Sequence, residues 1–309
     1  MAVEFVYSGL KNFQACLQEN WFLTNGVGAY CASSIIGAHN YLQQGYLVAS
    51  LNPPLDRIMV LSKTEEKITC GGRIFDLSTA VHQGKNSLEY NIGNQFLKNF
   101  KYDGCATFVY ECGRVKLTKE ITLVQNENTC VIRYIVENSA DEAKLSITPL
   151  LNFRDCDEEL DVDTLKSKLN FEMLEELPKA AESNKTIGFY YPLPLNDKYT
   201  VSVAVSEGTM VGRYKMYDDT ILLSHGTTEE QSAMDCSFAP LDFSINVPAG
   251  GVKEISFICQ LTKTTKKGVE LSLSANTAEG YLLKAKSRIE KLLKETGFEE
   301  ETENAKVLM

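Results

Sequence analysis

The residues of this chain that could do chemistry are its carboxyl groups and its three histidines. A carboxyl pair that works as general acid and base must flank the bond it cleaves, and in sugar-cleaving enzymes the two groups lie about 5 to 9.5 Å apart. The chain holds 41 acidic residues, and their spacing singles out no such pair. His39, His82 and His225 lie near no Gly-x-Ser-x-Gly or comparable motif. Each is expected to be a surface or hydrogen-bonded histidine, and the sequence predicts no catalytic residue.

The segment Asn25-Gly26-Val27-Gly28 has the small residues of a phosphate-binding loop. No third glycine, no Gly-Lys-Ser or Gly-Lys-Thr and no clear helix follows it, so the phosphate-loop interpretation fails. Asparagine beside glycine is typical of tight turns. We therefore expect a tight turn between two strands, ahead of direct contact with a ligand.

The acidic run at 154–163 resembles a calcium-binding loop at first sight. Counted from Asp155, the position that needs glycine holds Leu160, and the position that needs a bidentate glutamate holds Lys166. A solvated loop is the better interpretation. The nine cysteines include no Cys-x-x-Cys pair, and only three histidines could join them around a metal ion. The sequence therefore predicts no metal ion and no cofactor.

The elements that must position these residues are strands. Short apolar runs and alternation of period two dominate the chain up to about residue 262. Turn residues such as Gly71-Gly72 and Asp103-Gly104 separate the runs, and the helices that a parallel sheet would need between strands are missing. We therefore predict a mainly β fold, a large antiparallel sandwich, with strands at 46–51, 57–61, 67–70, 107–111, 115–124, 130–136, 145–151, 200–205, 241–247 and 254–261.

Two segments depart from the strand pattern. Residues 157–186 are charged and carry leucine or methionine at helical spacing, which indicates a short helix or a mobile insertion. Near the C-terminus, Asn276 with Glu279 suits the start of a helix and Gly297 suits its end. An acidic connector and a short apolar stub follow. The helix itself is predicted from an apolar stripe at spacings of three and four, formed by Ala278, Leu282, Ala285, Ile289 and Leu292.

Composition excludes several classes of partner. The formal net charge is −10 and the pI is about 5.0, so the chain has no electrostatic footprint for a nucleic-acid backbone. No run approaches the roughly 18 apolar residues of a membrane span, and the N-terminus lacks the basic start and apolar stretch of a signal peptide. The scattered cysteines, several of them inside apolar runs, indicate reduced thiols. We expect a cytoplasmic protein with no nucleic-acid and no membrane partner.

One aromatic-rich segment could face a carbohydrate. Trp21, the only tryptophan, lies near Asn25, and Tyr30, Tyr41 and Tyr46 follow. Sugars offer an apolar face to aromatic rings and hydroxyl groups to amides, carboxylates and guanidinium groups. Large aromatic residues also dominate core packing, so a core position for Trp21 is the first interpretation and a sugar-facing position the second.

Several motifs occur along the chain in an order that resembles one known family. They are 21–30 (Trp-Phe-Leu-Thr-Asn-Gly-Val-Gly-Ala-Tyr), 45–54 with Leu61-Ser62-Lys63, 96–104, 110–111, 117–120, 128–134, 145–155 and 243–251. In these motifs the chain resembles the N-terminal part of bacterial and archaeal glycogen debranching enzymes of the amylo-α-1,6-glucosidase type, which are glycoside hydrolases of glycogen catabolism.

The resemblance implies a β-supersandwich domain at 1–265. It implies a linker helix and a stub at 266–309 that lead to an α/α-barrel catalytic domain absent from this chain. The family's catalytic acid and base lie in that barrel, so no catalytic residue is carried over. The implied partners are the missing catalytic domain and an α-glucan, namely the branch points of glycogen or of a maltooligosaccharide, whose cleft the N-terminal domain would help to shape.

The residues that match the family's motifs are candidates for the glucan cleft or for the interdomain surface: Trp21, Thr24, Asn25, Gly26, Gly28, Tyr30, Arg154 and Asp155. Two places depart from the family. The segment Tyr41-Leu42-Gln43-Gln44-Gly45 stands where the family has Arg-Arg-Tyr-His-Gly, and Asp157 stands where it often has histidine. These departures leave a second hypothesis, a stand-alone glucan-binding or structural sandwich. A third, an epimerase- or mutarotase-like protein, needs a histidine and a carboxylate that converge in one pocket.

Overall fold

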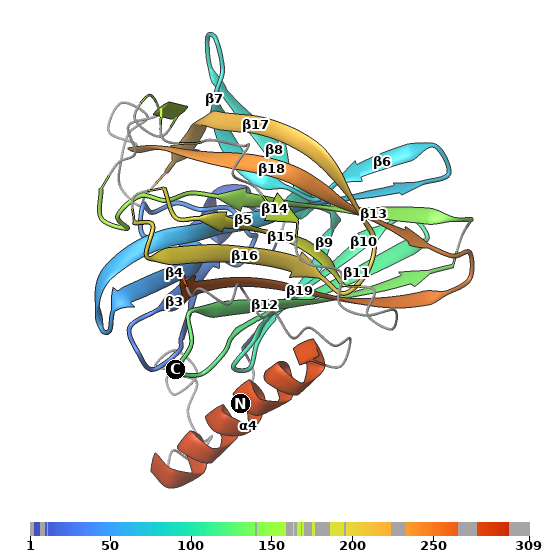
Figure 1. Cartoon of the computed structure of the whole chain (residues 1–309). Helices are drawn as coiled ribbons and strands as arrows, with labels where there is room; N and C mark the ends of the chain where they lie inside the picture. Colours follow the sequence, from blue (N-terminus) through green and yellow to red (C-terminus); the bar gives the residue numbers. More distant parts are fainter. Residues whose placement is uncertain are drawn as a thin grey trace.

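Two antiparallel β-sheets lie face to face, and one long helix, α4 (Thr277–Thr296), lies below them in Figure 1. The structure is a computed structural model, which describes residues 3–6, 10, 12–139, 141–158, 163, 166–167, 169, 175–176, 186–194, 196–223, 233–264 and 277–296. The prediction of a mainly β antiparallel sandwich with a helix near the C-terminus is confirmed. The division at residue 265 stays a prediction.

Each sheet mixes strands from distant parts of the chain. The first sheet runs in the order β1 (Val3–Val6), β9 (Leu97–Tyr102), β10 (Ala106–Cys112), β11 (Val115–Leu123), β12 (Thr129–Asn138), β19 (Val252–Lys263), β16 (Tyr199–Val205), β15 (Ile187–Pro192) and β14 (Glu175–Glu176). The second runs β2 (Asn20–Thr24), β3 (Tyr30–Ser34), β4 (Gly45–Asn52), β5 (Leu55–Cys70), β13 (Ala143–Leu151), β18 (Ala233–Val247), β17 (Thr209–Leu222), β7 (Thr79–Gln83) and β8 (Leu88–Ile92), with β6 (Arg73–Asp76) beside β5. Two short helices, α2 (Phe13–Gln18) and η1 (Gly93–Phe96), complete the described elements.

Alternation of side chains decides what faces the core. In β2, Trp21 and Leu23 point inward and are buried, whereas Phe22 and Thr24 point outward and are exposed. Buried phenylalanines from both sheets, such as Phe100, Phe108 and Phe243, fill the space between them. All the strands predicted from alternation fall within observed strands, except that β11 ends one residue early at Leu123.

Strand β5 corrects one detail of the sequence analysis. The predicted strands 57–61 and 67–70 are the two ends of a single 16-residue strand. The polar run between them resembles a break, yet its side chains are buried. Lys63 and Glu65 form an ion pair at 3.4 Å, and Ser78 Oγ donates a 2.7 Å hydrogen bond to Glu65. Polar residues can continue a buried strand when partners on neighbouring strands satisfy them.

The helix α4 packs on the outer face of the first sheet. Its Ala278 joins an apolar cluster with Val124, Val131, Ala204 and Ile258. Leu282 is also buried. The first half of the stripe therefore faces the sheet, whereas Leu292 at its end is 42% exposed; the predicted helix is confirmed. Its predicted caps, Asn276 and Gly297, and most of the segment 157–186 lie outside the described residues.

Two ion pairs fasten α4 to the same sheet. Lys286 Nζ lies 3.1 Å from Glu120 Oε1 on β11, and Arg133 on β12 lies 3.7 Å from Glu279. None of the helices in the described part of the chain combines the length and the apolar composition that a bilayer span requires.

Candidate functional site

The predicted tight turn between β2 and β3 is held by Asn25. Its Oδ1 atom accepts hydrogen bonds from the backbone N–H groups of Val27 and Ala29, each at 3.0 Å, and its Nδ2 atom donates to the carbonyl of Glu127 at 2.8 Å. Asn25 is fully buried. Asparagine suits this role because its short amide can satisfy turn N–H groups and still reach a neighbouring segment. The side chain thus ties the turn to the β11–β12 connection.

Both glycines of the turn are required by geometry. Gly26 and Gly28 have positive φ angles of 84° and 99°, a conformation that side-chain-bearing residues rarely adopt. A Cβ atom on Gly28 would lie 2.6 Å from Cα of Pro54, and one on Gly26 would lie 2.2 Å from Nε2 of Gln125. The turn therefore packs against protein on both sides, which agrees with its interpretation as a structural turn.

Trp21 lies in the core. Only 5% of it is exposed, its Nε1 atom donates a 3.0 Å hydrogen bond to the carbonyl of Ser34, and its ring packs among Tyr46, Phe100 and Phe108 at centroid distances of 6.2 to 6.5 Å. This position agrees with the first interpretation of Trp21, a core residue, and not with a sugar-facing residue.

Arg154 is also buried and acts as a structural hub. Its Nε atom lies 3.0 Å from Asp235 Oδ1, and its NH1 group donates to the carbonyls of Asp155 and Cys156, each at 3.1 Å. A third group, NH2, donates to the carbonyl of Leu42 at 2.5 Å. The guanidinium thus joins β18 to the segments before β4 and after β13, so it positions surface residues without lying on the surface itself.

Two of the three remaining candidates, Tyr30 and Asp155, lie on a surface area that we call the Tyr30 patch: Phe22, Tyr30, Gln43, Arg57, Asp155 and Asp157. The rings of Phe22 and Tyr30 stack at 5.1 Å, and Arg57 lies 5.9 Å from the Tyr30 centroid. Tyr30 donates a 2.8 Å hydrogen bond to the carbonyl of Gln43. Burial of the hydroxyl, with Cys156 and Asp157 nearby, raises the pKa of Tyr30, so its phenol stays protonated.

The two departures from the family meet on this patch. Gln43 Nε2 donates a 3.2 Å hydrogen bond to Asp157 Oδ1. By the resemblance described above, Gln43 belongs to the segment that would stand in place of Arg-Arg-Tyr-His-Gly, and Asp157 would stand in place of histidine. The amide and the carboxylate satisfy each other, so both changes fit one local arrangement.

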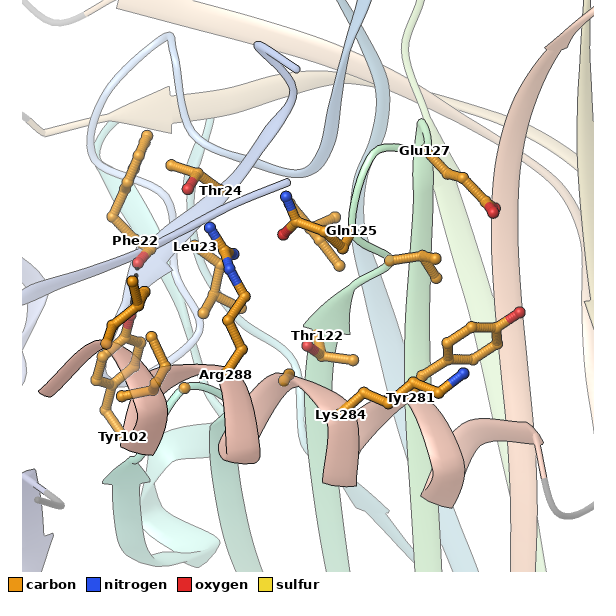
Figure 2. A pocket seen from close by; sticks show the side chains of 16 residues that line it. Phe22, Leu23, Thr24, Tyr102, Thr122, Gln125, Glu127, Tyr281, Lys284 and Arg288 are labelled. Carbon is orange, nitrogen blue, oxygen red and sulfur yellow. Dashed lines mark hydrogen bonds between the residues drawn. The ribbon is translucent and has the colours of Figure 1, made fainter. Parts of the chain in front are cut away.

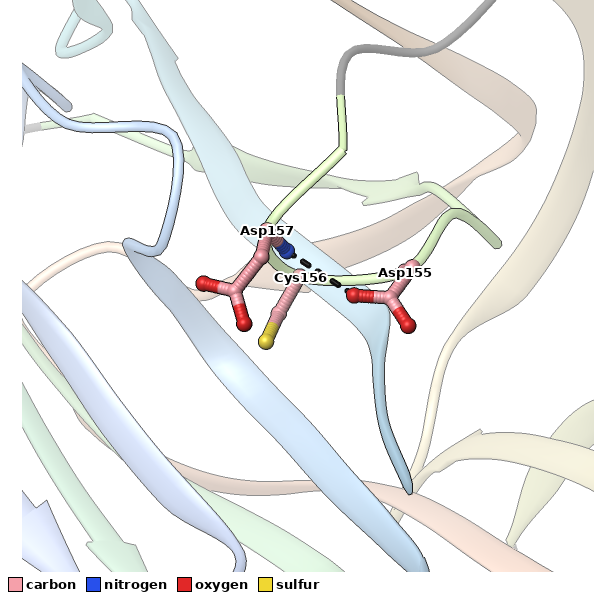
Figure 3. Close-up of side chains that lie close together, drawn as sticks. All are labelled: Asp155, Cys156 and Asp157. Atoms are coloured by element: carbon pink, nitrogen blue, oxygen red, sulfur yellow. Dashed lines mark hydrogen bonds between the residues drawn. The ribbon is translucent and has the colours of Figure 1, made fainter. Parts of the chain in front are cut away.

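Asp155, Cys156 and Asp157 bring three possible metal ligands together. Their ligand atoms lie within 4.8 Å of one another on a single turn, which the Asp157 N–H closes with a 3.0 Å hydrogen bond to Asp155 (Figure 3). Metal binding by cysteine requires the thiolate. Burial and the neighbouring Asp157 carboxylate raise the pKa of Cys156, which disfavours that form. The turn therefore gives no support for a metal site.

Thr24 lies at a second surface, a groove between α4 and the ends of β2 and β11 (Figure 2). The groove has a volume of about 590 Å³. Phe22 and Tyr102 lie at one end and Tyr281 and Lys284 at the other, while Gln125 and Glu127 lie along the upper rim (Figure 2). Phe22 belongs both to this groove and to the Tyr30 patch, so the two surfaces are continuous.

The histidines differ from one another. His82 Nδ1 lies 3.0 Å from Asp219, and Asn91 lies 3.2 Å from its other ring nitrogen, so it is hydrogen-bonded as predicted. This is a histidine–carboxylate pair of the kind that the third hypothesis needs, but both ring nitrogens are engaged. His39 is half-buried, and its Nε2 atom has no hydrogen-bond partner within the described residues. His225 lies outside them.

The fold defines the chain as a two-sheet antiparallel β-sandwich with an appended helix. A family model described as glycogen debranching enzyme N terminal matches residues 19–253. The chain belongs to this family.

Other comparisons are more distant. No curated protein matches the chain. Among solved structures, a bacterial glucoamylase complexed with acarbose is 11% identical over 88% of this chain and 35% of its own, with a TM-score of 0.38. An aldose epimerase homologue from C. elegans is 9% identical over 80% of this chain and 99% of its own, with a TM-score of 0.42. Heparan sulfate lyase HepC from Pedobacter heparinus is 8% identical over 67% of this chain and 23% of its own, with a TM-score of 0.31. All three TM-scores lie below 0.5, so we infer nothing from them. The chain spans about a third or less of the glucoamylase and the lyase.

Several residues of these surfaces escaped the sequence analysis. Phe22 could have been found, because alternation in β2 places it opposite the buried Trp21. Arg57, Gln125 and Arg288 carry no local signal. They reach the site from three different elements that only the tertiary structure brings together.

Proposed function

We propose that this chain is the N-terminal domain of a cytoplasmic glycogen-debranching enzyme, an amylo-α-1,6-glucosidase that hydrolyses α-1,6-glucosidic branch points. In this proposal the domain is non-catalytic, packs on the catalytic barrel and shapes the glucan cleft. The family match over residues 19–253 carries the proposal. Nine free cysteines support a reducing compartment.

The arrangement of acidic residues supports a non-catalytic role. The carboxylates of Asp155 and Asp157 leave one turn side by side (Figure 3), whereas a glycosidase pair approaches the bond from two sides. Glu65 and Glu66 are buried in ion pairs with Lys63 and Lys119. These four groups are therefore poorly placed to act on an external glucan.

The Tyr30 patch and the β2–β3 turn are the surfaces we assign to the cleft or to the barrel interface. Phe22 is 51% exposed although it is a large aromatic residue. The adjoining Tyr30, Arg57 and Asp157 combine a ring, a cation and a carboxylate, which suits contact with a glucan or with polar residues of another domain. Buried Asn25 and Arg154 act in this proposal as supports.

The test measures glucose release from a branched α-1,6-linked glucan. The purified 309-residue chain should release none, and addition of a catalytic barrel domain from a family member should restore turnover. Hydrolysis by the chain alone, abolished by Asp155→Asn with Asp157→Asn, would refute the non-catalytic role. A chain that never supports barrel activity would favour the stand-alone module.

A further inference from the structure

The groove beside α4 has the size and shape of a ligand site. Its volume of about 590 Å³ lies within the roughly 300 to 1,000 Å³ that is usual for small-molecule pockets. It follows α4 from Tyr281 to Leu292, which at 1.5 Å per residue is a length of about 16 Å. An open trough of this length suits a linear chain of linked units better than a single compact molecule.

The walls of the groove match the chemistry of sugars. Aromatic rings lie at both ends, Phe22 and Tyr102 at one and Tyr281 at the other (Figure 2). Tyr102 donates a 2.8 Å hydrogen bond to the backbone carbonyl of Phe22, which orients the Tyr102 ring. Between the rings lie apolar side chains, including Leu123 and Ile289. Such a floor can pack against the C–H faces of sugar rings, which carry apolar area without charge.

Polar groups along the rim are free to bind hydroxyls. Arg288 points from α4 toward Thr24 and Gln125 (Figure 2). Within the described residues, its guanidinium makes no hydrogen bond and no ion pair. Gln125 is exposed and bonds only to the side chain of Asn126, at 3.2 Å, among those residues. An amide and a guanidinium that face open space can donate to several hydroxyl groups at once.

The charged side chains of the groove are of both signs. Lys284 and Arg288 lie on one side of the groove and Glu127 on the rim (Figure 2). Cationic and carboxylate groups can donate to and accept from hydroxyl groups, so this lining is compatible with a neutral polyhydroxyl compound.

We propose that this groove is a binding site for a linear α-1,4-glucan segment and can hold a glucan chain on the isolated domain. The choice of an α-glucan among neutral oligosaccharides rests on the proposed function. The assignment of the groove as a binding site rests only on its own residues. Phe22 and Tyr281 supply the stacking surfaces, and Arg288 and Gln125 supply the hydrogen bonds.

The experiment is calorimetric titration of maltoheptaose into the full 309-residue chain. Phe22→Ala and Arg288→Ala should each weaken binding at least tenfold. Both side chains are exposed, so the variants should keep the melting temperature of the parent. Matched controls are Ile74→Ala and Arg73→Ala on the exposed β6 hairpin, which should leave binding unchanged.

Three outcomes would overturn the proposal. These are absence of binding at millimolar maltoheptaose, binding that the groove variants leave unchanged, and equal affinity for cellohexaose, which would remove the assignment to an α-glucan. Loss of binding in the groove would leave the hydrolysis test above untouched. Likewise, failure to restore barrel activity would not alter a measured maltoheptaose affinity, so the two proposals can fail separately.

Discussion

The side chain of Lys119 shows how a charged residue can belong to a sandwich core. It lies between the sheets, and its Nζ atom is 2.9 Å from Glu66 Oε1. Tyr134 donates a 2.7 Å hydrogen bond to the same carboxylate, and the ring of Tyr46 lies 4.8 Å from Nζ. Burial lowers the pKa of Lys119 while Glu66 opposes that change. The buried charges of Lys119 and Glu66 are therefore compensated only when both residues are present.

Removal of one member should leave the other charged and unpaired. We expect Lys119→Met to lower the free energy of unfolding by about 3 to 5 kcal/mol, because the Glu66 carboxylate loses its counterion in the core. The measurement is urea unfolding followed by fluorescence. Lys116→Met is the matched control on the same strand, since its ion pair with Glu137 is exposed and should contribute about 1 kcal/mol or less. Equal losses in the two variants would contradict the expectation.

His39 should make stability depend on pH. Burial, together with Lys63, Arg154 and Lys119, lowers the pKa of His39 to about 3. The unfolded chain takes up a proton near pH 6.5, whereas the folded chain does not until about pH 3. Between these values the unfolded state binds more protons, so the free energy of unfolding falls as the pH falls.

The comparison is His39→Gln against the parent chain, with urea unfolding at intervals from pH 7 to pH 4. The variant should show a shallower decline, since glutamine takes up no proton and other titrating groups are common to both chains. Parallel curves would show that His39 is not held neutral in the folded state.

At the scale of the elements, the packing of α4 against the sandwich depends on a glycine in the β9–β10 turn. Gly104, in the β9–β10 turn, has a φ of 91°, and a Cβ atom there would lie 2.7 Å from Cγ1 of Ile289. Gly104→Ala should therefore strain the turn and push the second half of α4 away from the sheet. Hydrogen exchange of α4 amides should accelerate.

Gly72→Ala is the matched control. Gly72 also has a positive φ, 73°, but no atom lies within 4 Å of its Cβ position. Both variants bear the backbone cost of roughly 1 to 2 kcal/mol, and only Gly104→Ala should alter α4. Unchanged exchange in α4 would show that Ile289 gives way without moving the helix.

The regularity of the apolar pattern in each element decides whether that element could be predicted from the sequence. Strands such as β11 and β12 alternate cleanly, and α4 carries a regular stripe, so local patterns sufficed. Strand β17 was missed because it is mostly exposed and its register shifts twice against β18, which blurs the alternation. The site was only partly visible. Small residues marked the β2–β3 turn, but nothing near Arg154 reveals that Asp235, 81 residues away, holds it in the interior.

At the scale of the whole molecule, the helix and the sandwich share an apolar contact. Val131, Ala204 and Ile258 lie on the outer face of the first sheet, and they are buried with Val124, which follows β11, and with Ala278 of α4. The predicted division at residue 265 would separate the helix from this face. Buried apolar area contributes about 25 cal/mol per Å², so we expect α4 to stabilise the sandwich as well as to come after it in the chain.

A truncated chain of residues 1–265 tests this expectation. It should melt at a lower temperature than the full chain and bind a hydrophobic dye, because the loss of α4 uncovers Val131 and Ile258 and leaves Glu120 without Lys286. The control is a chain of residues 1–296, which keeps the helix and removes only residues 297–309. Identical melting temperatures and dye fluorescence for the two chains would place the domain boundary at 265. A lower melting temperature for 1–265 alone would place it after α4, with the helix as part of the folded unit.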